Sequence, residues 1–414
     1  MELRKSLGVL ALVATATAAG CTGGGGDAMS PAQELAARAR ELADRLMIVD
    51  THIDVPYRLR AQLDAGETPA DVAGPVAEMD FDYPRAVSGG LDLPFMSIYI
   101  PAGYQDGRAK AFADELIDQM EGVVASAPDK FAIVTSTTDA ERAVADGKIG
   151  FAWGMENGAP IEGDLDNLRH FHERGIRYVT LTHSKDNHIC DSSYDDTRTW
   201  SGLSPFGREL IPEMNRLGVM IDISHVSDDA FYQVLSISQA PVIASHSSCR
   251  KYTPGWERNM SDDMIRALGA AGGVIQINFG SSFISDAYRA QSQAMRDHLR
   301  SYFEQNEIAR DSDEGRAYVE QYRAENPIPF ADLADVVEHI EHVVSLVGVD
   351  HVGIGSDYDG VGDSLPTGLK DVASYPNLIG ALLEKGYTEE EIEKICSGNL
   401  MRVWRKVEAI AEAG

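Results

Sequence analysis

The sequence predicts an α/β protein and, within that class, a single (β/α)8 barrel. Two observations support this prediction. About eight short runs of apolar and β-branched residues recur along the 414-residue chain, and helical patterns lie between most of them. Near-continuous apolar strands that alternate with helices are typical of a parallel sheet covered by helices, and about eight such units are typical of a closed, TIM-like barrel.

The predicted strands are apolar, and most of them end in polar residues. They cover residues 47–49, 94–100, 149–153, 178–182, 219–223, 242–244, 273–279 and 352–355. Helical patterns between them include residues 165–174, 207–217, 227–236 and 261–271. Ser227 and Ser261 precede acidic residues at the start of two of these helices, so both are expected to be N-caps.

Two segments do not fit a minimal barrel. Residues 285–326 are polar and helical in pattern, and they predict a helical insertion between the seventh and eighth strands. Residues 56–90 are expected to form a loop-rich excursion after the first strand. Either segment could act as a lid or as an oligomer contact.

The first 30 residues predict export and a lipid anchor. Arg4 and Lys5 precede an uncharged apolar run, residues 7–19, which is shorter than the ~20 residues that a membrane-spanning helix needs. Residues 1–20 are therefore predicted to be a lipoprotein signal peptide, because residues 18–21 resemble a bacterial lipobox. Cys21 would be lipidated, and residues 21–30 would form a glycine-rich tether. The alternative is a soluble exported protein cleaved nearby.

A single barrel domain, residues 31–414, is predicted after the tether, since no repeat or long linker divides it. The expected location is the bacterial cell envelope, facing the periplasm or the exterior. The chain has 36 Lys and Arg against 65 Asp and Glu, a formal net charge of −29, so nucleic acid is not expected as a partner. Cys190, Cys249 and Cys396 allow at most one disulfide among them, and their spacing does not select a pair.

Residues able to bind a metal ion or move a proton lie at the ends of six of the eight runs. They are His52, Asp54, Glu156, His183, His225, His246 and Asp357. In a barrel, the carboxyl ends of all strands open on one face, so residues about 300 positions apart become neighbours there. A single histidine at a strand end is usually structural, whereas several in phase with the barrel indicate a functional site.

The His-x-Asp pattern after the first strand places two metal ligands on the same side of a pleat. Imidazole nitrogen and carboxylate oxygen suit Zn²⁺ or a similar divalent ion, and a carboxylate can bridge two ions. We therefore expect two zinc ions per chain with Glu156 as the bridge. One ion would take His52, Asp54 and Glu156, and the other would take Glu156, His225 and His246.

Several longer motifs surround these residues in a fixed order. They are DTHIDVP (50–56), GMENG (154–158), LTH (181–183), ISH (223–225), SHSS (245–248), ERN (257–259), GSDYDG (355–360) and SGNL (397–400). Taken together, they make the chain resemble the membrane dipeptidases, the renal dipeptidase-like metallopeptidases with amidohydrolase-type barrels. The resemblance covers about residues 45–405, which is nearly all of the predicted mature chain.

The resemblance implies a zinc-dependent hydrolase of dipeptides, including dipeptides with a D-residue on the C-terminal side. The five metal-binding residues named above would hold the two zinc ions. His183, Arg258 and Asp357 would contact the substrate, with the guanidinium fork of Arg258 on the terminal carboxylate. Relatives are often dimers, so a homodimer is expected, and a lipid anchor suits a membrane-attached hydrolase.

The expected mechanism uses a hydroxide that bridges the two ions, because such ions lower the pKa of bound water. As catalytic residues, His183 would stabilise the oxyanion, and Asp357 would accept the water proton and pass it to the leaving amine. Three departures from the family pattern concern substrate choice. Asn157 replaces a usual glycine, Phe283 lies where a tyrosine is expected, and residues 91–94 replace a glycine-rich approach to the second strand.

Two other classes of function stay open on the residues alone. One is another binuclear barrel hydrolase, such as a deaminase, a lactonase or a phosphotriesterase-like enzyme. Many of these use a carboxylated lysine after the fourth strand, where this chain has His183 with Lys185 two residues further on. The other is a solute-binding lipoprotein without activity, and the complete ligand set disfavours it.

The remaining polar candidates have weaker patterns. His188 follows His183 and could line the pocket. An acidic loop in the same region could be a rim or a calcium site, and its members are Asp186, Asp191, Asp195 and Asp196. The histidines on or near helices are expected on solvated faces; they are His170, His172, His339, His342 and His351.

Overall fold

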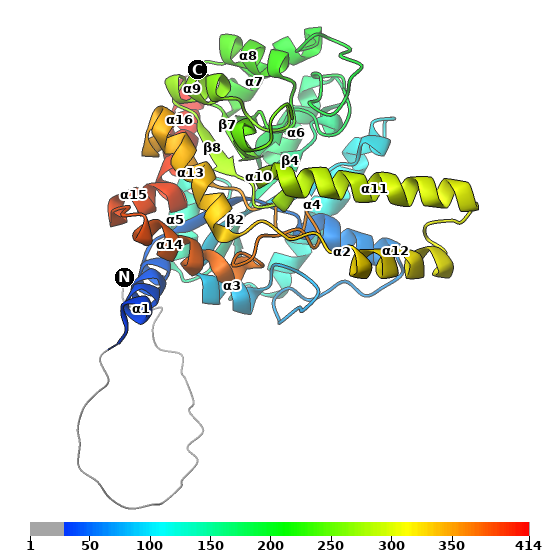
Figure 1. Ribbon diagram of the computed structural model, residues 1–414. Helices are drawn as coiled ribbons and strands as arrows, with labels where there is room; N and C mark the ends of the chain where they lie inside the picture. Colours follow the sequence, from blue (N-terminus) through cyan, green and yellow to red (C-terminus); the bar gives the residue numbers. More distant parts are fainter. Residues whose placement is uncertain (1–28, 414) are drawn as a thin grey trace, which may run out of the picture.

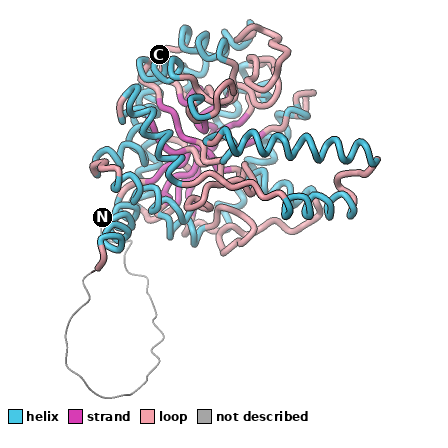
Figure 2. The backbone as a smooth tube through the Cα atoms, viewed as in Figure 1, coloured by secondary structure: helices cyan, strands magenta, loops and turns pink. Residues whose placement is uncertain are grey.

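The computed structural model describes residues 29–413, in which a parallel sheet forms a nearly closed barrel surrounded by helices (Figure 1). Figure 2 shows the strands gathered at the centre with helices outside them. The barrel strands are β1 (Ile48–Ile53), β2 (Leu91–Tyr99), β4 (Ile149–Glu156), β5 (Ile176–Thr180), β6 (Met220–Asp222), β7 (Ile243–Ser247), β8 (Val274–Ile277) and β9 (Val352–Ile354), in that spatial order. Their pairing is parallel throughout, so all carboxyl ends open on the same side.

The two ends of the sheet meet where β1 and β9 finish. The Asp54 N–H donates to the Tyr358 carbonyl at 2.9 Å, and the Asp357 N–H donates to the His52 carbonyl at 3.0 Å. These bonds hold together two segments about 300 residues apart in the sequence, both of which contain predicted site residues. The predicted (β/α)8 barrel is confirmed.

The helices also follow the predicted order. They are α1 (Pro31–Arg45), α2 (Val55–Asp64), α3 (Tyr83–Gly89), α4 (Ala109–Ser126), α5 (Thr137–Ala145), α6 (Leu165–Glu173), α7 (Pro205–Leu217), α8 (Asp228–Ile237), α9 (Asp262–Ala270), α10 (Ser281–Ile284), α11 (Asp286–Asn306), α12 (Asp313–Glu325), α13 (Leu333–Val347), α14 (Tyr375–Glu384), α15 (Glu389–Glu393) and α16 (Asn399–Ala413). The Ser227 and Ser261 side chains accept backbone N–H bonds at the starts of α8 and α9, as N-caps do. The four predicted helices correspond to α6, α7, α8 and α9.

Two features differ from the sequence prediction. A short strand, β3 (Phe131–Ile133), pairs with β4 outside the barrel order; three residues are too few to show a periodic pattern. The loop-rich excursion predicted for residues 56–90 is partly wrong, because α2 and α3 lie within it. Each of these helices has a proline in its first turn, where the missing N–H leaves no helical hydrogen bond unmade.

The predicted insertion between the seventh and eighth barrel strands is confirmed. It forms a hairpin of α11 and α12 that projects to one side of the barrel (Figure 1). None of the helices within residues 29–413 is long and apolar enough to cross a membrane. Cys190, Cys249 and Cys396 are buried and free, so no disulfide joins them. The predicted signal peptide, the lipidation site Cys21 and most of the tether lie outside the described residues.

Candidate functional site

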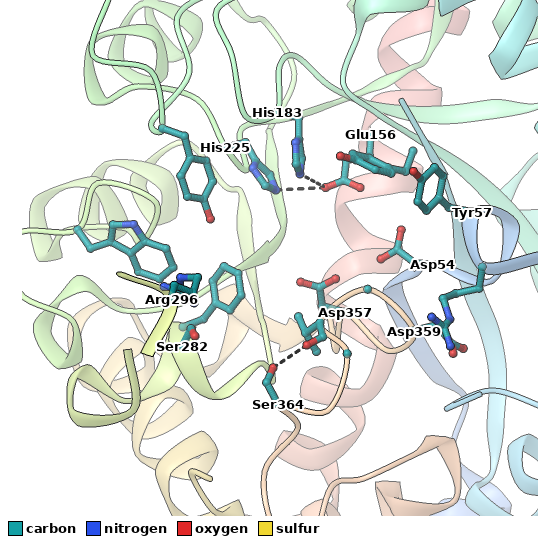
Figure 3. Close-up of a pocket in the computed structure, with 18 residues that line it drawn as sticks. Asp54, Tyr57, Glu156, His183, His225, Ser282, Arg296, Asp357, Asp359 and Ser364 are labelled. Carbon is teal, nitrogen blue, oxygen red and sulfur yellow. Dashed lines mark hydrogen bonds and ion pairs between the residues drawn. The ribbon is translucent and has the colours of Figure 1, made fainter. Parts of the chain in front are cut away.

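All seven residues predicted at the strand ends lie together at one mouth of the barrel. They are His52 in β1, Asp54 directly after it, Glu156 at the end of β4, His183 after β5, His225 after β6, His246 in β7 and Asp357 after β9. Figure 3 shows Asp54, Glu156, His183, His225 and Asp357 around a single cavity. Their side chains are at least nine-tenths buried except for that of His183, which is 20% exposed.

The backbone is strained at two of these positions. His225 has a φ of 69° and Asp357 a φ of 65°, in the left-handed region that non-glycine residues rarely adopt. The bonds around them hold this conformation: the His225 carbonyl accepts the Ser193 N–H at 2.7 Å, and the Asp357 N–H donates to β1. Such conformations concentrate at functional sites, where the surrounding structure determines the direction of the side chain.

Glu156 lies at the centre of the cluster. Its Oε2 atom is 3.3 Å from His52 Nε2. Its Oε1 atom is 3.2 Å from His225 Nε2 and 3.3 Å from His246 Nε2. His183 Nε2 lies 3.5 Å from the same Oε1 atom. One carboxylate therefore faces different imidazoles with its two oxygens, which is the arrangement that a bridging ligand requires.

The ligand atoms fall into three compact groups, each within 4.8 Å. The groups are His52, Glu156 and His246; Glu156, His183 and His225; and His52, Asp54 and Asp357. The structure thus brings together every predicted ligand. None of the three groups is identical to a predicted triad, because each group contains one residue from outside it. The rings of His52 and His246 stack with centroids 3.7 Å apart, so the two predicted metal positions are neighbours.

The residues fit a centre for divalent ions in three respects. The donors are imidazole nitrogens and carboxylate oxygens, the set that zinc and similar ions prefer. His52 Nε2 is buried and has no hydrogen-bond partner among the described residues. Gly360 leaves space in front of two carboxylates, because a Cβ at this position would collide with Asp54 and Asp357.

The protonation of the cluster follows from burial and close charges. Burial and the nearby Arg258 hold the pKa of His225 well below its usual value, and burial with His52 does the same for His246. Both imidazoles are therefore neutral, the form that binds a metal ion. Burial opposes ionisation of Glu156, yet the neighbouring histidines hold the pKa of this carboxyl well below its usual value.

Two other groups have raised pKa values. Burial, with the Asp54 and Glu156 carboxylates nearby, raises the pKa of Asp357 well above its usual value. Burial disfavours a charged His52, but the Tyr178 hydroxyl and the Glu156 and Asp54 carboxylates hold the pKa of His52 well above its usual value. A metal ion at His52 Nε2 would take the place of a proton there.

The cavity over this cluster has a volume of about 730 Å³, within the range of small-molecule sites. Acidic residues and imidazoles line it where the strands end. Aromatic side chains line the remaining wall, and they include Tyr57, Tyr99, Tyr194, Trp256 and Phe283. Phe283, predicted from its departure from the family pattern to affect substrate choice, is thus a lining residue.

Arg258, which the resemblance places at the substrate, is buried beside a residue that lines the cavity. Its guanidinium is 5.1 Å from the centre of the Phe283 ring, and it is not among the residues that line the cavity. Its Nη1 atom donates to Ser247 Oγ at 2.9 Å and its Nη2 atom to the His246 carbonyl at 2.8 Å. Arg258 therefore braces the end of β7, and its buried Nε lacks a partner among the described residues.

His188 does not line this cavity. It borders a separate one of about 400 Å³ with Gln105 and Asn187. The acidic loop is structural, because its carboxylates accept the loop's own N–H groups. Asp186 accepts from Ser192 and Thr199, and Asp191 accepts from Trp200 and Gly202.

The prediction of a solvated His339 is wrong. The side chain is fully buried against Tyr252, with ring centroids 4.4 Å apart. The Cys249 N–H donates to its Nδ1 at 3.0 Å, and its Nε2 lies 3.2 Å from the Ile284 carbonyl. Both ring nitrogens are used, so this histidine has a structural role.

Several residues that hold the site in place were missed. Tyr178, Asp222 and Ser245 contact site histidines or their neighbours from inside the barrel. Strand alternation could have found Tyr178, because every second residue of a barrel strand faces the interior. The contact of Tyr178 with His52 on β1 could not be predicted from the spacing of residues in the sequence.

Similarity to known proteins agrees with the geometry. Residues 36–414 match the family described as membrane dipeptidase, peptidase family M19. An uncharacterised dipeptidase of Schizosaccharomyces pombe is 34% identical over 395 residues, covering 90% of this chain and 83% of that protein. The structure of the probable dipeptidase PvdM from Pseudomonas aeruginosa superposes with a TM-score of 0.77 at 28% identity, covering 92% of this chain and 100% of that one.

A third relative shows the same fold at lower identity. It is a metallopeptidase of Rhodobacter sphaeroides, solved with a phosphinate mimic of the dipeptide L-Ala-D-Ala, with 24% identity and a TM-score of 0.71 over 87% of this chain and 99% of that one. Fold and site together define a barrel hydrolase of the metallopeptidase class. The chain belongs to the membrane dipeptidase family, M19.

Proposed function

We propose that the protein is a dinuclear zinc dipeptidase that hydrolyses the peptide bond of dipeptides. The position of Glu156 is the observation that supports this most directly, since its two oxygens face His52 on one side and His225 and His246 on the other. Membership of a dipeptidase family supports the peptide bond as the target. In this proposal His52, Asp54 and Glu156 hold one ion, and Glu156, His225 and His246 hold the second.

The ions, when bound, supply a water molecule of lowered pKa and polarise the scissile carbonyl. Asp357 is the proposed general base and acid, which accepts the proton of the water and passes it to the leaving amine. Asn278 Nδ2 donates to its Oδ2 at 2.7 Å, which fixes the carboxyl and leaves the other oxygen for the water or for the leaving amine. The backbone at Asp357 directs this side chain toward His52 and Asp54.

His183 is the proposed stabiliser of the oxyanion. It is the most exposed residue of the cluster and lines the cavity, so a substrate can reach its ring. Burial lowers the pKa of His183, so the ring is neutral and can donate one N–H without carrying a charge. Tyr99 packs against this ring at 4.8 Å and fixes its orientation.

Arg258 is the proposed receptor for the substrate's terminal carboxylate. Its Nη atoms donate to Ser247 and to the His246 carbonyl, whereas its Nε–H has no partner among the described residues, which supports Arg258 as a donor to a carboxylate. Tolerance of a D-residue on the C-terminal side is supported by the similar metallopeptidase of Rhodobacter sphaeroides, which was solved with a mimic of L-Ala-D-Ala.

For the whole protein we propose a lipoprotein of the bacterial cell envelope, anchored through Cys21 and acting as a homodimer. The lipobox-like residues 18–21 support the anchor. Palmitate labelling of the wild type and of Cys21→Ser tests it, and sedimentation of the soluble domain tests the dimer.

The function is tested by metal analysis and a dipeptide panel. We expect about two zinc ions per chain, and release of amino acids from L,L and L,D dipeptides that a chelator stops and zinc restores. Two ions without dipeptide cleavage would move the function to another amide or ester bond. A chain that binds no metal and hydrolyses nothing would be a solute-binding protein, and the proposal would be wrong.

A further inference from the structure

The two nitrogens of the His52 imidazole face different surroundings, one toward the site and one away from it. Nε2 faces the Glu156 and Asp54 carboxylates. Nδ1 faces the interior of the barrel and lies 2.9 Å from the hydroxyl of Tyr178, a residue of β5. His52 and Tyr178 are both fully buried, so no water replaces this contact.

The direction of the hydrogen bonds between these groups is determined. The Tyr178 hydroxyl also lies 2.9 Å from the Thr51 carbonyl, which can only accept, so the single hydroxyl proton goes there. The Tyr178 oxygen must then accept from His52, and Nδ1 must carry a proton. Since Nδ1 is protonated whatever the charge of the ring, Nε2 is the atom of His52 that can bind a metal ion.

A glycine makes this contact possible. Gly154 of β4 pairs with Tyr178 of β5, and a Cβ on Gly154 would collide with the Tyr178 ring and hydroxyl. Because Gly154 has no side chain, the Tyr178 phenol can pack against β4 and extend toward β1. Gly154 of β4 and Tyr178 of β5 therefore act together, because the glycine leaves the space in which the Tyr178 hydroxyl contacts His52 of β1.

His246 is held differently. Its Nδ1 is 2.7 Å from Ser245 Oγ, which donates to Asp222 Oδ2 at 2.6 Å. The same reasoning places a proton on Nδ1 of His246, but this chain of bonds ends on a carboxylate. The chain from His52 ends on a neutral carbonyl. Losing the Tyr178 hydroxyl leaves Nδ1 of His52 without its hydrogen-bond partner, while Nδ1 of His246 keeps Ser245.

We propose that Tyr178 is a positioning residue: its hydroxyl fixes the tautomer and orientation of His52 so that Nε2 is presented to a divalent ion. The inference rests on the proposed metal centre but not on the substrate. Partners of this kind raise the metal affinity of a histidine about 10- to 100-fold.

The test compares Tyr178→Phe with the wild type by titrating zinc and cobalt into the apoprotein against a chromophoric chelator. We expect one of the two ions to bind at least about tenfold more weakly and the other to bind unchanged. The visible spectrum of the cobalt protein should change for the weakened ion alone. At saturating zinc, kcat should recover to within a fewfold and KM should be unchanged.

Tyr358→Phe is the matched control, because Tyr358 is a fully buried phenol whose hydroxyl donates to the Leu369 carbonyl at 3.3 Å. It should bind both ions as the wild type does. If Tyr178→Phe does not fold, ¹⁵N-histidine NMR of the zinc-loaded wild type replaces it, with His52 assigned by its absence in His52→Gln. A protonated, slowly exchanging Nδ1 of His52 is the expected result.

Unchanged binding of both ions by folded Tyr178→Phe, or an unprotonated His52 Nδ1, would overturn the inference and leave the proposed function standing. A wild type that binds no divalent ion would overturn both. A wild type that binds two ions and cleaves no dipeptide would overturn the proposed substrate alone.

Discussion

The mouth of the barrel and the α11–α12 hairpin differ in how their polar side chains are held. At the mouth, Asp222 is fully buried and accepts bonds from Thr180, Ser224 and Ser245. In the hairpin, charged residues pair three positions along their own helix and stay exposed, as Asp297 and Arg300 do.

This difference predicts how each region responds to mutation. Exposed pairs contribute at most about 1 kcal/mol, whereas breaking a buried and fully bonded network costs several times more. Within α11 and α12 only Tyr288, Leu299 and Gly315 are buried. The mouth should therefore be intolerant of single changes and the hairpin tolerant of them.

Glu156→Gln tests the mouth with the largest expected effect. An amide has one oxygen and no charge, so it cannot bridge two ions between His52 and the His225–His246 pair. We expect fewer than two zinc ions per chain and a loss of kcat/KM of at least about a thousandfold, near 4 kcal/mol. Metal analysis and dipeptide hydrolysis measure this.

Glu173→Gln is the control, since Glu173 is exposed at the end of α6. It should keep the metal content and activity of the wild type. A Glu156→Gln enzyme with two ions and normal turnover would show that the mouth tolerates change as the hairpin does.

Asp357→Asn removes a proton acceptor and leaves the rest of the mouth in place. Asparagine tolerates the positive φ of this position, so the backbone should be unaltered. We expect kcat to fall at least about a hundredfold with metal content and KM little changed, as for loss of a general base. A fall in metal content instead would make Asp357 a ligand, consistent with its group of His52 and Asp54.

The sequence predicted the mouth well because its pattern is repeated. Six of the eight apolar runs end in a residue able to bind a metal ion or move a proton, and barrel geometry brings such ends together, so residues as distant as His52 and Asp357 could be assigned to one site. The grouping of ligand atoms was not predictable, because it depends on ring orientations set by partners such as Tyr178.

Other misses have the same physical origin. His339 was expected in solvent because its helix spacing lacks carboxylates, but its partners are the backbone of Cys249 and Ile284, which leave no trace in composition. The role of Arg258 at the substrate stays a prediction from the resemblance, and only its bonds to Ser247 and the His246 carbonyl could not be predicted from the sequence.

His339 joins the two regions, because it links the loop after β7 to α10 at the base of the hairpin. Burial lowers the pKa of His339 to about 4. Below pH ~6.5 the unfolded chain takes up a proton that the folded chain refuses, so stability falls as pH drops from about 6.5 to 4. We expect His339 to account for a loss of about 2 kcal/mol in the free energy of unfolding at pH 5.

Urea unfolding at pH 5 and pH 8 measures this loss in the wild type and in His339→Gln, which has no proton to take up. The variant should lose less stability on acidification. Burial also lowers the pKa of His188 and of His172 to about 4, so part of the acid dependence should persist. An identical pH dependence in both proteins would contradict the buried role of His339.

Tyr302→Ala tests the hairpin with the smallest expected effect. The rings of Tyr302 in α11 and Tyr318 in α12 stack at 3.5 Å, and Tyr302→Phe keeps this stack. Losing this stack should lower the free energy of unfolding by about 1 kcal/mol, as measured by urea unfolding. Tyr302 does not line the cavity, to which α11 contributes Arg296, so kcat/KM should stay within about twofold.

A tenfold change in kcat/KM for Tyr302→Ala, absent in Tyr302→Phe, would show that hairpin packing positions Arg296 over the substrate. The hairpin would then function as part of the mouth.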